Sequence, residues 1–145
     1  MRFRFRLQTV YDLRQHEEEE QKNTLSRARG RLVELEEAER SLRSDKDQWS
    51  RRYMEGARAG FLPQEAACIG GYLEDLELRI GQAAHGREQQ AAVVERERLV
   101  LISRMQARKT LEKLRGRQFE RFSYGEQRKT EKEIEELIVS RRGGA

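Results

Sequence analysis

The stretch "LSRARGRLVELEEAERSLRSDKDQWSRRY", residues 25–53, decides the expected fold of this chain. Its seam positions alternate in steps of three and four residues, which is the heptad pattern of a helix that packs against another helix. They are Leu25, Ala28, Leu32, Leu35, Glu39, Leu42, Lys46, Trp49 and Tyr53. The seam is imperfect because Glu39 and Lys46 are charged. An apolar stripe continues upstream, so we predict a first helix over about residues 5–55.

The segment "EGARAGFLPQ", residues 55–64, ends this helix. Gly56 and Gly60 give the chain freedom, and Pro63 cannot continue a helix but suits the first turn of a new one. We therefore expect a break over about residues 56–63 and a second helix over about 64–141. Its apolar stripe comprises Ile69, Leu73, Leu76, Ile80, Ala83, Val94, Leu101, Leu111 and Leu114. Glycines inside it predict local bending or fraying, above all at Gly70-Gly71.

Two helices joined by a short break must fold back to cover their seams. The sequence thus predicts an all-α fold, a long two-helix antiparallel coiled-coil hairpin with the longer helix second, forming one domain over residues 1–145. With the turn near residue 60, position i faces roughly position 120 − i, and about 25 residues overhang at the C-terminal end. We expect a monomer when alone, because the seam is satisfied within the chain. A homodimer of open chains and a disordered chain are the alternatives.

The composition agrees with a narrow helical seam. Charged residues make up 39% of the chain and hydrophobic residues 36%, against about 25% and about 45–50% in average soluble domains. The net charge is +4, and 24 of the 30 basic residues are arginine, which suits bidentate contact with carboxylate or phosphate. A single cysteine, the absence of an apolar run of about 20 residues and the absence of a signal peptide lead us to expect a cytoplasmic protein.

The predicted open end of the hairpin is rich in cations. Arg2, Arg4, Arg6 and Arg14 lie near the start of the chain, opposite "RMQARKTLEKLRGRQFER", residues 104–121, which holds seven basic and two acidic residues. Cations at a helix N-terminus oppose the macrodipole, so they do not help the helix to form. They form either a solvated charged face or a surface for an acidic partner.

The sequence offers no site for chemistry. His16 and His85 are isolated, "IGGY" at residues 69–72 has neither a lysine nor a strand before it, and Cys68 has no neighbouring histidine. Metal binding, phosphate binding and thiol catalysis each need such neighbours. We therefore expect neither an enzyme nor a cofactor.

Two groups of apolar side chains are candidates for contacts. Tyr72 and Leu76 share a helix face near the turn, where they either staple the hairpin tip or form an exposed docking patch. Phe119, Phe122 and Tyr124 lie on the predicted overhang, where we expect no helix of this chain to cover them. These aromatics suggest a binding partner.

Both ends of the chain resemble the FliJ family of flagellar export proteins. "FRFRLQTVYDLRQHEEEEQ", residues 3–21, is similar to its N-terminal signature of an aromatic residue, Leu-Gln, an apolar-Asp-Leu-Arg run and then glutamates and glutamine. "RFSYGEQRKTEKEIEELIVSRR", residues 121–142, resembles its closing pattern, with Glu135-Glu136 in place of the usual Asp-Glu pair. The likeness covers nearly the whole chain. Stalk proteins of virulence type III secretion systems are a close second.

The resemblance implies a hairpin similar to the gamma subunit of rotary ATPases. It implies a non-enzymatic stalk that enters the pore of the hexameric export ATPase and promotes its assembly and turnover. It also implies binding to the cytoplasmic part of the export-gate membrane protein and to export chaperones, and hence a peripheral position at the inner membrane. The implied ATPase-ring residues are Arg4, Arg6, Leu13, Arg14, Glu126, Glu135 and Glu136.

The resemblance further implies a patch for the export gate just after the turn, at Tyr72, Leu76, Arg79 and Ala83. The first two match the family's aromatic and apolar positions, whereas Arg79 replaces a small residue and Ala83 replaces a histidine. Two other functions stay open. A nucleic-acid-binding coiled coil would show steep salt dependence, although acids interleave with the bases and we expect no nucleic acid. A generic scaffold would dimerise and ignore the ATPase.

Overall fold

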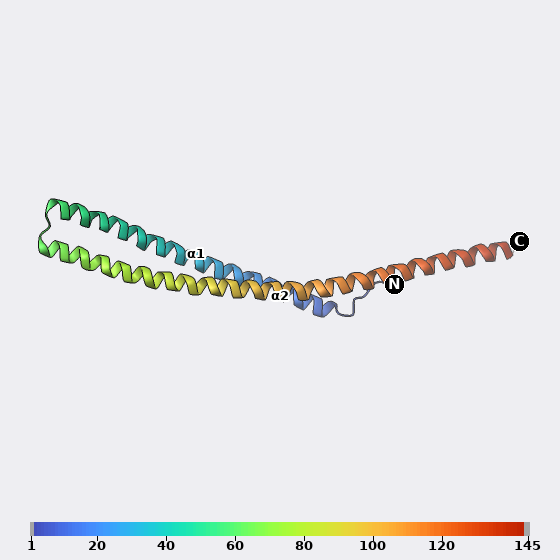
Figure 1. Cartoon of the computed structure of the whole chain (residues 1–145). Coiled ribbons are helices and arrows are strands. Elements are labelled where there is room, and N and C mark those ends of the chain that lie inside the picture. The colour runs from blue at the N-terminus through green and yellow to red at the C-terminus, as the bar shows by residue number, and fades with distance from the viewer. Residues whose placement is uncertain (1, 144–145) are drawn as a thin grey trace. The chain divides into compact units, whose positions relative to one another are not determined.

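A computed structural model describes residues 2–143, and its regular structure consists of two α-helices without strands in that range. Helix α1 spans Gln8–Ala59 and helix α2 spans Pro63–Gly143, with 52 and 81 residues respectively (Figure 1). The predicted all-α hairpin with a longer second helix is confirmed. Neither helix holds an apolar stretch that could cross a membrane, as judged over residues 2–143.

The helix ends follow from local chemistry. Gly60 has φ +91°, a left-handed conformation that glycine adopts without strain after a helix C-terminus. Pro63 is the first residue of α2, where its missing N–H costs nothing. The break is shorter than the predicted one, because α1 continues through Gly56 to Ala59. The N-terminal end also differs from the prediction, since α1 begins at Gln8 rather than near residue 5.

The described chain divides into two compact units, one formed by residues 2–20 with 102–143 and one by residues 21–101. We describe each unit by itself, the first as unit 1 and the second as unit 2. Both contain part of α1 and part of α2, running antiparallel. The organisation as a single domain stays a prediction.

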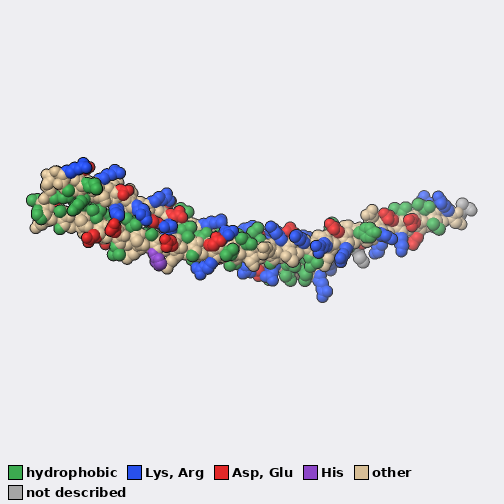
Figure 2. Space-filling model, in the orientation of Figure 1, with side chains coloured by type: hydrophobic (Ala, Val, Ile, Leu, Met, Phe, Trp, Pro, Cys, Tyr) green, Lys and Arg blue, Asp and Glu red, His purple; other side chains and the backbone are tan. Residues whose placement is uncertain are grey.

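Unit 2 shows the antiparallel register through its cross-helix contacts. Gln21 Nε2 donates to the Glu97 carbonyl oxygen at 3.0 Å, and the Trp49 and Tyr72 ring centroids lie 5.3 Å apart near the turn. These pairings match the register expected for a turn near residue 60. Hydrophobic side chains gather beside that turn (Figure 2), where Met54 and Leu62 are exposed.

Charged seam positions are satisfied across the hairpin. Glu39 is buried, and its carboxylate accepts hydrogen bonds from Arg43 at 3.0 Å on its own helix and Arg87 at 2.5 Å on the other. Lys46 pairs with Glu77 at 3.0 Å. A buried carboxylate is tolerated when charged donors satisfy it, so the imperfect seam still closes.

The hydrophobic core is thin, as the composition predicted. The buried apolar side chains are Phe5, Tyr11, Leu25, Leu76 and Ile80. The fraying expected at Gly70-Gly71 is absent, because α2 runs unbroken through both residues. Packing elsewhere along the helix offsets the glycine cost of up to about 1 kcal/mol each.

Candidate functional site

The N-terminal segment, residues 2–7, precedes α1 and lies against α2 in unit 1. The Phe3 ring meets Phe119 edge-on at 5.3 Å between centroids and Phe122 at 5.6 Å. We expected no helix of this chain to cover Phe119 and Phe122, and the contacts come instead from the non-helical N-terminal segment. Residues 2–5 have no regular structure and residues 6–7 form a turn, in which the Gln8 N–H donates to the Phe5 carbonyl oxygen at 3.0 Å, so Phe3 is not held where a helical start would place it.

The aromatic and arginine residues of this segment alternate in burial. Phe5 is buried and Phe3 half-buried, whereas Arg2, Arg4 and Arg6 are exposed. The phenylalanines therefore pack inward, with Phe3 against α2, and the arginines face solvent. The three arginines form no ion pair within residues 2–143. This period of two was the signal in the sequence that pointed away from a helix.

Phe119 is 51% exposed and Phe122 half-buried, and Tyr124 is the most exposed aromatic of that group. Its side chain is 61% exposed. Arg128, one turn further along α2, donates from Nη1 to the tyrosine hydroxyl oxygen at 3.0 Å. Residues 127–143 are exposed throughout, so the unpaired end of α2 is shorter than the predicted overhang.

Ion pairs join α1 and α2 within unit 1, on the side of the N-terminal segment that lies toward the turn. Glu17 accepts from Arg14 at 3.0 Å and from Arg104 at 2.7 Å. The hydrogen bond from Arg14, with a further contribution from Arg104, lowers the pKa of the Glu17 carboxyl, although partial desolvation opposes the shift. Both cations are thus neutralised by a carboxylate of the same unit.

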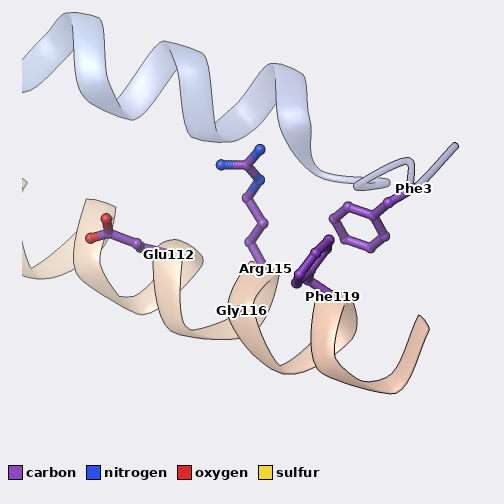
Figure 3. A pocket seen from close by; sticks show the side chains of 5 residues that line it. All are labelled: Phe3, Glu112, Arg115, Gly116 and Phe119. Carbon is purple, nitrogen blue, oxygen red and sulfur yellow. The ribbon is translucent and has the colours of Figure 1, made fainter. Parts of the chain in front are cut away.

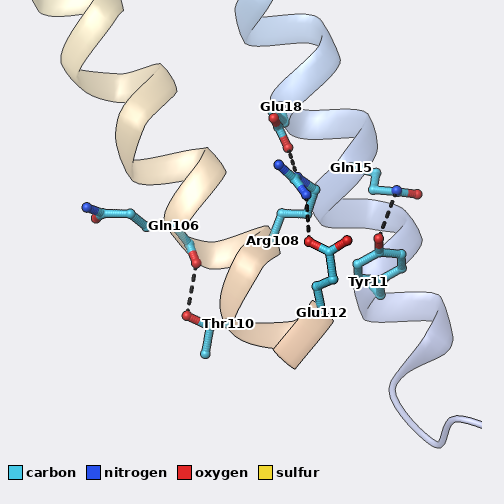
Figure 4. Close-up of polar contacts among 7 residues, drawn as sticks. All are labelled: Tyr11, Gln15, Glu18, Gln106, Arg108, Thr110 and Glu112. Carbon is cyan, nitrogen blue, oxygen red and sulfur yellow. Dashed lines mark hydrogen bonds and ion pairs between the residues drawn. The ribbon is translucent and has the colours of Figure 1, made fainter. Parts of the chain in front are cut away.

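Arg108 occupies the centre of a second ionic contact (Figure 4). Its guanidinium bonds the buried Glu18 carboxylate across the hairpin and also Glu112 at 2.9 Å on its own helix. The hydrogen bond with Glu18 raises the pKa of Arg108. Beside it, the buried Tyr11 accepts a hydrogen bond from Gln15 Nε2 at 3.1 Å. Arg104 and Arg108 are therefore structural cations rather than free ones.

The remaining cations of residues 104–121 have no such partner. They are Lys109, Lys113, Arg115, Arg117 and Arg121, and none forms an ion pair within residues 2–143. Glu17 and Glu18 thus neutralise part of the positive charge expected at this end of the hairpin, while the rest stays exposed to solvent. A surface of unpaired cations favours contact with an acidic partner.

The residues implied for the ATPase ring do not form one cluster. Arg4 and Arg6 are exposed on the N-terminal segment, Leu13 is exposed on α1, and Arg14 is bound to Glu17. On α2, Glu126 is half-buried, and its carbonyl accepts from the Thr130 hydroxyl at 3.0 Å. Glu135 and Glu136 are exposed and line a shallow hollow with Lys132, Val139 and Ser140. They lie roughly 20 Å along the helix beyond Phe122.

The residues implied for the export gate belong to unit 2. Leu76 is only 1% exposed, which supports the role of hairpin staple for this residue and leaves it little surface for a partner. Tyr72 is 37% exposed and packs on Trp49. Arg79 is paired with Asp75 at 2.9 Å, and Ala83 is half-buried.

Trp49 was missing from the sequence-based gate patch. It lines an apolar hollow of about 230 Å³ with Cys68, Ile69 and Tyr72. The Arg52 guanidinium lies 4.6 Å from the centroid of the Trp49 ring. The heptad pattern places Trp49 in the helical seam. The sequence does not show that Trp49 is half-buried, because its exposure depends on how α2 faces α1.

An apolar hollow of unit 1 is lined by Phe3, Glu112, Arg115, Gly116 and Phe119 and has a volume of about 410 Å³ (Figure 3). We call it the Phe3–Phe119 hollow. In Figure 3 the Phe3 and Phe119 rings lie against each other at one side, and Arg115 rises between Phe119 and Glu112 toward α1. The sequence assigned no site to Arg115 or Gly116, because the hollow exists only once the N-terminal segment is laid against α2.

The described residues hold no group of three or more histidine, cysteine, aspartate or glutamate side chains placed to bind a metal ion. The arrangement offers surfaces for binding, namely unpaired arginines, two apolar hollows and exposed aromatics.

Comparisons with known proteins bear on the function of these surfaces. No curated protein and no solved structure matches the chain. The family model described as flagellar FliJ protein matches residues 3–143, and the chain therefore belongs to the FliJ family, whose members are components of flagellar protein export.

Proposed function

We propose that this protein is a non-enzymatic stalk that binds the hexameric flagellar export ATPase through unit 1 and promotes its assembly and turnover. One observation carries the proposal: Arg4 and Arg6 are exposed and unpaired within residues 2–143, on a segment that Phe3 and Phe5 anchor to α2. Anchoring matters because a preorganised charge loses less conformational entropy when it binds.

The chemistry of such a surface suits a ring lined with carboxylates. Unpaired arginines steer an acidic partner and form bidentate contacts with its carboxylates. Arg14 contributes less to this surface than the family pattern implies, because Glu17 already holds it. We therefore assign the ATPase contact first to Arg4 and Arg6.

The test is ATP turnover by the cognate export ATPase with and without this protein, together with ring size by light scattering. The wild type should stimulate turnover and shift the ATPase toward hexamers. The double variant Arg4→Glu/Arg6→Glu should weaken binding by about tenfold or more, since two exposed attractions each become repulsions. Because both residues precede α1, the change leaves the helices intact.

A matched control is Arg27→Glu/Arg29→Glu. These two arginines are also exposed, also two positions apart and also without an ion pair in the described chain, but they lie in unit 2. The control makes the same change in net charge and should leave ATPase stimulation unchanged. Equal loss with both double variants would reduce the effect to net charge, and no stimulation by the wild type would end the stalk proposal.

We place the link to the cytoplasmic part of the export gate at the turn end of unit 2. The support is the partly exposed Tyr72 beside Trp49 and their shared apolar hollow. Tyr72→Ala should lower affinity for the soluble part of the gate without changing helicity. The same role includes binding to export chaperones and a peripheral position at the inner membrane. We propose that the protein is a monomer when alone.

Family membership favours the flagellar system over virulence type III secretion. Nucleic-acid binding is the alternative that the unpaired cations leave to be tested. It predicts affinity for a generic duplex that falls steeply with salt, as phosphate contacts release counterions. Saturable stimulation of the ATPase at about 150 mM salt, without duplex binding, would decide against it.

A further inference from the structure

The Phe3–Phe119 hollow has the composition of a binding site rather than of a packing defect. Its volume of about 410 Å³ lies within the range of about 300–1,000 Å³ typical of ligand pockets. Two phenylalanine rings form its apolar side, and Phe119 is 51% exposed although Phe3 covers part of it. Apolar surface that is left open beside a charged rim is typical of interaction sites.

The charges around the hollow are unequal. Glu112, its single acidic residue, is already bound to Arg108 at 2.9 Å. Arg115 has no carboxylate partner in the described chain and also lines a neighbouring hollow of about 350 Å³ with Arg4, Phe3, Phe5 and Gln8. The free charge at the rim is therefore positive, and it lies directly beside the aromatic side.

We infer that the Phe3–Phe119 hollow receives a leucine- or phenylalanine-sized side chain that an acidic protein surface presents next to a carboxylate, which Arg115 and Arg4 bind. The inference rests on the proposed function, which makes that surface the export ATPase ring. It adds an apolar anchor to a contact otherwise made of charges. Buried apolar anchors set residence time, whereas exposed charges set the rate of encounter.

Gly116 allows the hollow to be filled without disturbing the fold. It lies one turn from both Glu112 and Phe119 on the same face of α2, and a Cβ atom built on it meets nothing within 4 Å. The variant Gly116→Leu would extend a side chain into the space where the partner's residue is to sit. Leucine also favours the helix over glycine, so helicity should not fall.

Gly125→Leu is the matched control. Gly125 is also inside α2, belongs to the same unit and has the same open surroundings, but it does not line the hollow. Affinity of the full-length variants for the cognate export ATPase would be measured by biolayer interferometry, with helicity followed by circular dichroism. Gly116→Leu should weaken binding by about tenfold or more, mainly through faster dissociation, and Gly125→Leu by less than about twofold.

Three results would overturn the inference, and they separate it from the stalk proposal. If Gly116→Leu binds the ATPase as tightly as the wild type, the hollow is not a binding site, and the stalk proposal is unaffected. Equal loss in both glycine variants would attribute the effect to helix stiffness. If the wild type does not bind the ATPase, both the proposed function and the binding role of the hollow are excluded.

Discussion

Leu76 offers the sharpest test of how the hairpin is held together. Its side chain is 1% exposed in a seam with few fully buried residues. Replacement by alanine removes three heavy atoms, which at about 0.8 kcal/mol per buried methylene costs about 2.4 kcal/mol. A cavity term adds to this, but a two-helix seam can partly collapse, and alanine returns a few tenths of a kcal/mol in helix propensity. We expect Leu76→Ala to destabilise the protein by about 2–3 kcal/mol.

The assay is urea unfolding followed by circular dichroism at about 222 nm, where α-helices give a strong negative band. With an m-value of about 2 kcal/mol per molar, the midpoint should fall by roughly 1 M. Leu78→Ala is the control, because Leu78 lies on the same helix but is 62% exposed. It should shift stability by less than about 0.5 kcal/mol.

Equal midpoints for the two leucine variants would refute this reasoning. They would show that Leu76 is not part of a core. Leu76 would then be assigned to the docking patch that the family pattern implies. A large shift for Leu76→Ala alone would mean that any loss of gate binding in that variant reflects a disturbed tip. Tyr72→Ala then becomes the informative variant for the gate contact.

Two other predictions concern charge and backbone. The hydrogen bond with Arg43, and then that with Arg87, lowers the pKa of the Glu39 carboxyl in the folded state. The contribution of Glu39 to stability is therefore complete above the unfolded pKa of about 4.3 and is lost as pH falls through the lower, folded pKa. Urea midpoints at about pH 7 and 3 should therefore differ more for the wild type than for Glu39→Gln; equal differences would contradict the ion pairing. Gly71→Ala should raise the melting temperature, with a gain of about 0.5–1 kcal/mol, because a Cβ there meets nothing within 4 Å. Gly56→Ala should not raise it, because its Cβ would collide with the Phe61 ring; similar gains in both would show that the ring moves freely.

Part of the candidate site could be predicted from the sequence. The cations at residues 2–14 and 104–121 were recognisable from composition and from the expected register. Which of them are free was not, because ion pairing across the hairpin depends on the exact facing of two helices. Arg104 and Arg108 are held by Glu17 and Glu18, whereas Arg4 and Arg115 are not.

The sequence by itself determined the architecture, because heptad spacing, Gly60 and Pro63 act through local geometry that needs no knowledge of the partner helix. Those signals also fixed the antiparallel register near the turn. Only the tertiary structure decided that residues 2–7 lie outside α1, that Leu76 is buried while Tyr72 is partly open, and that a hollow lies beside Phe119. Each of these depends on which side of α2 meets the rest of the chain, and that is set by packing between residues far apart in sequence.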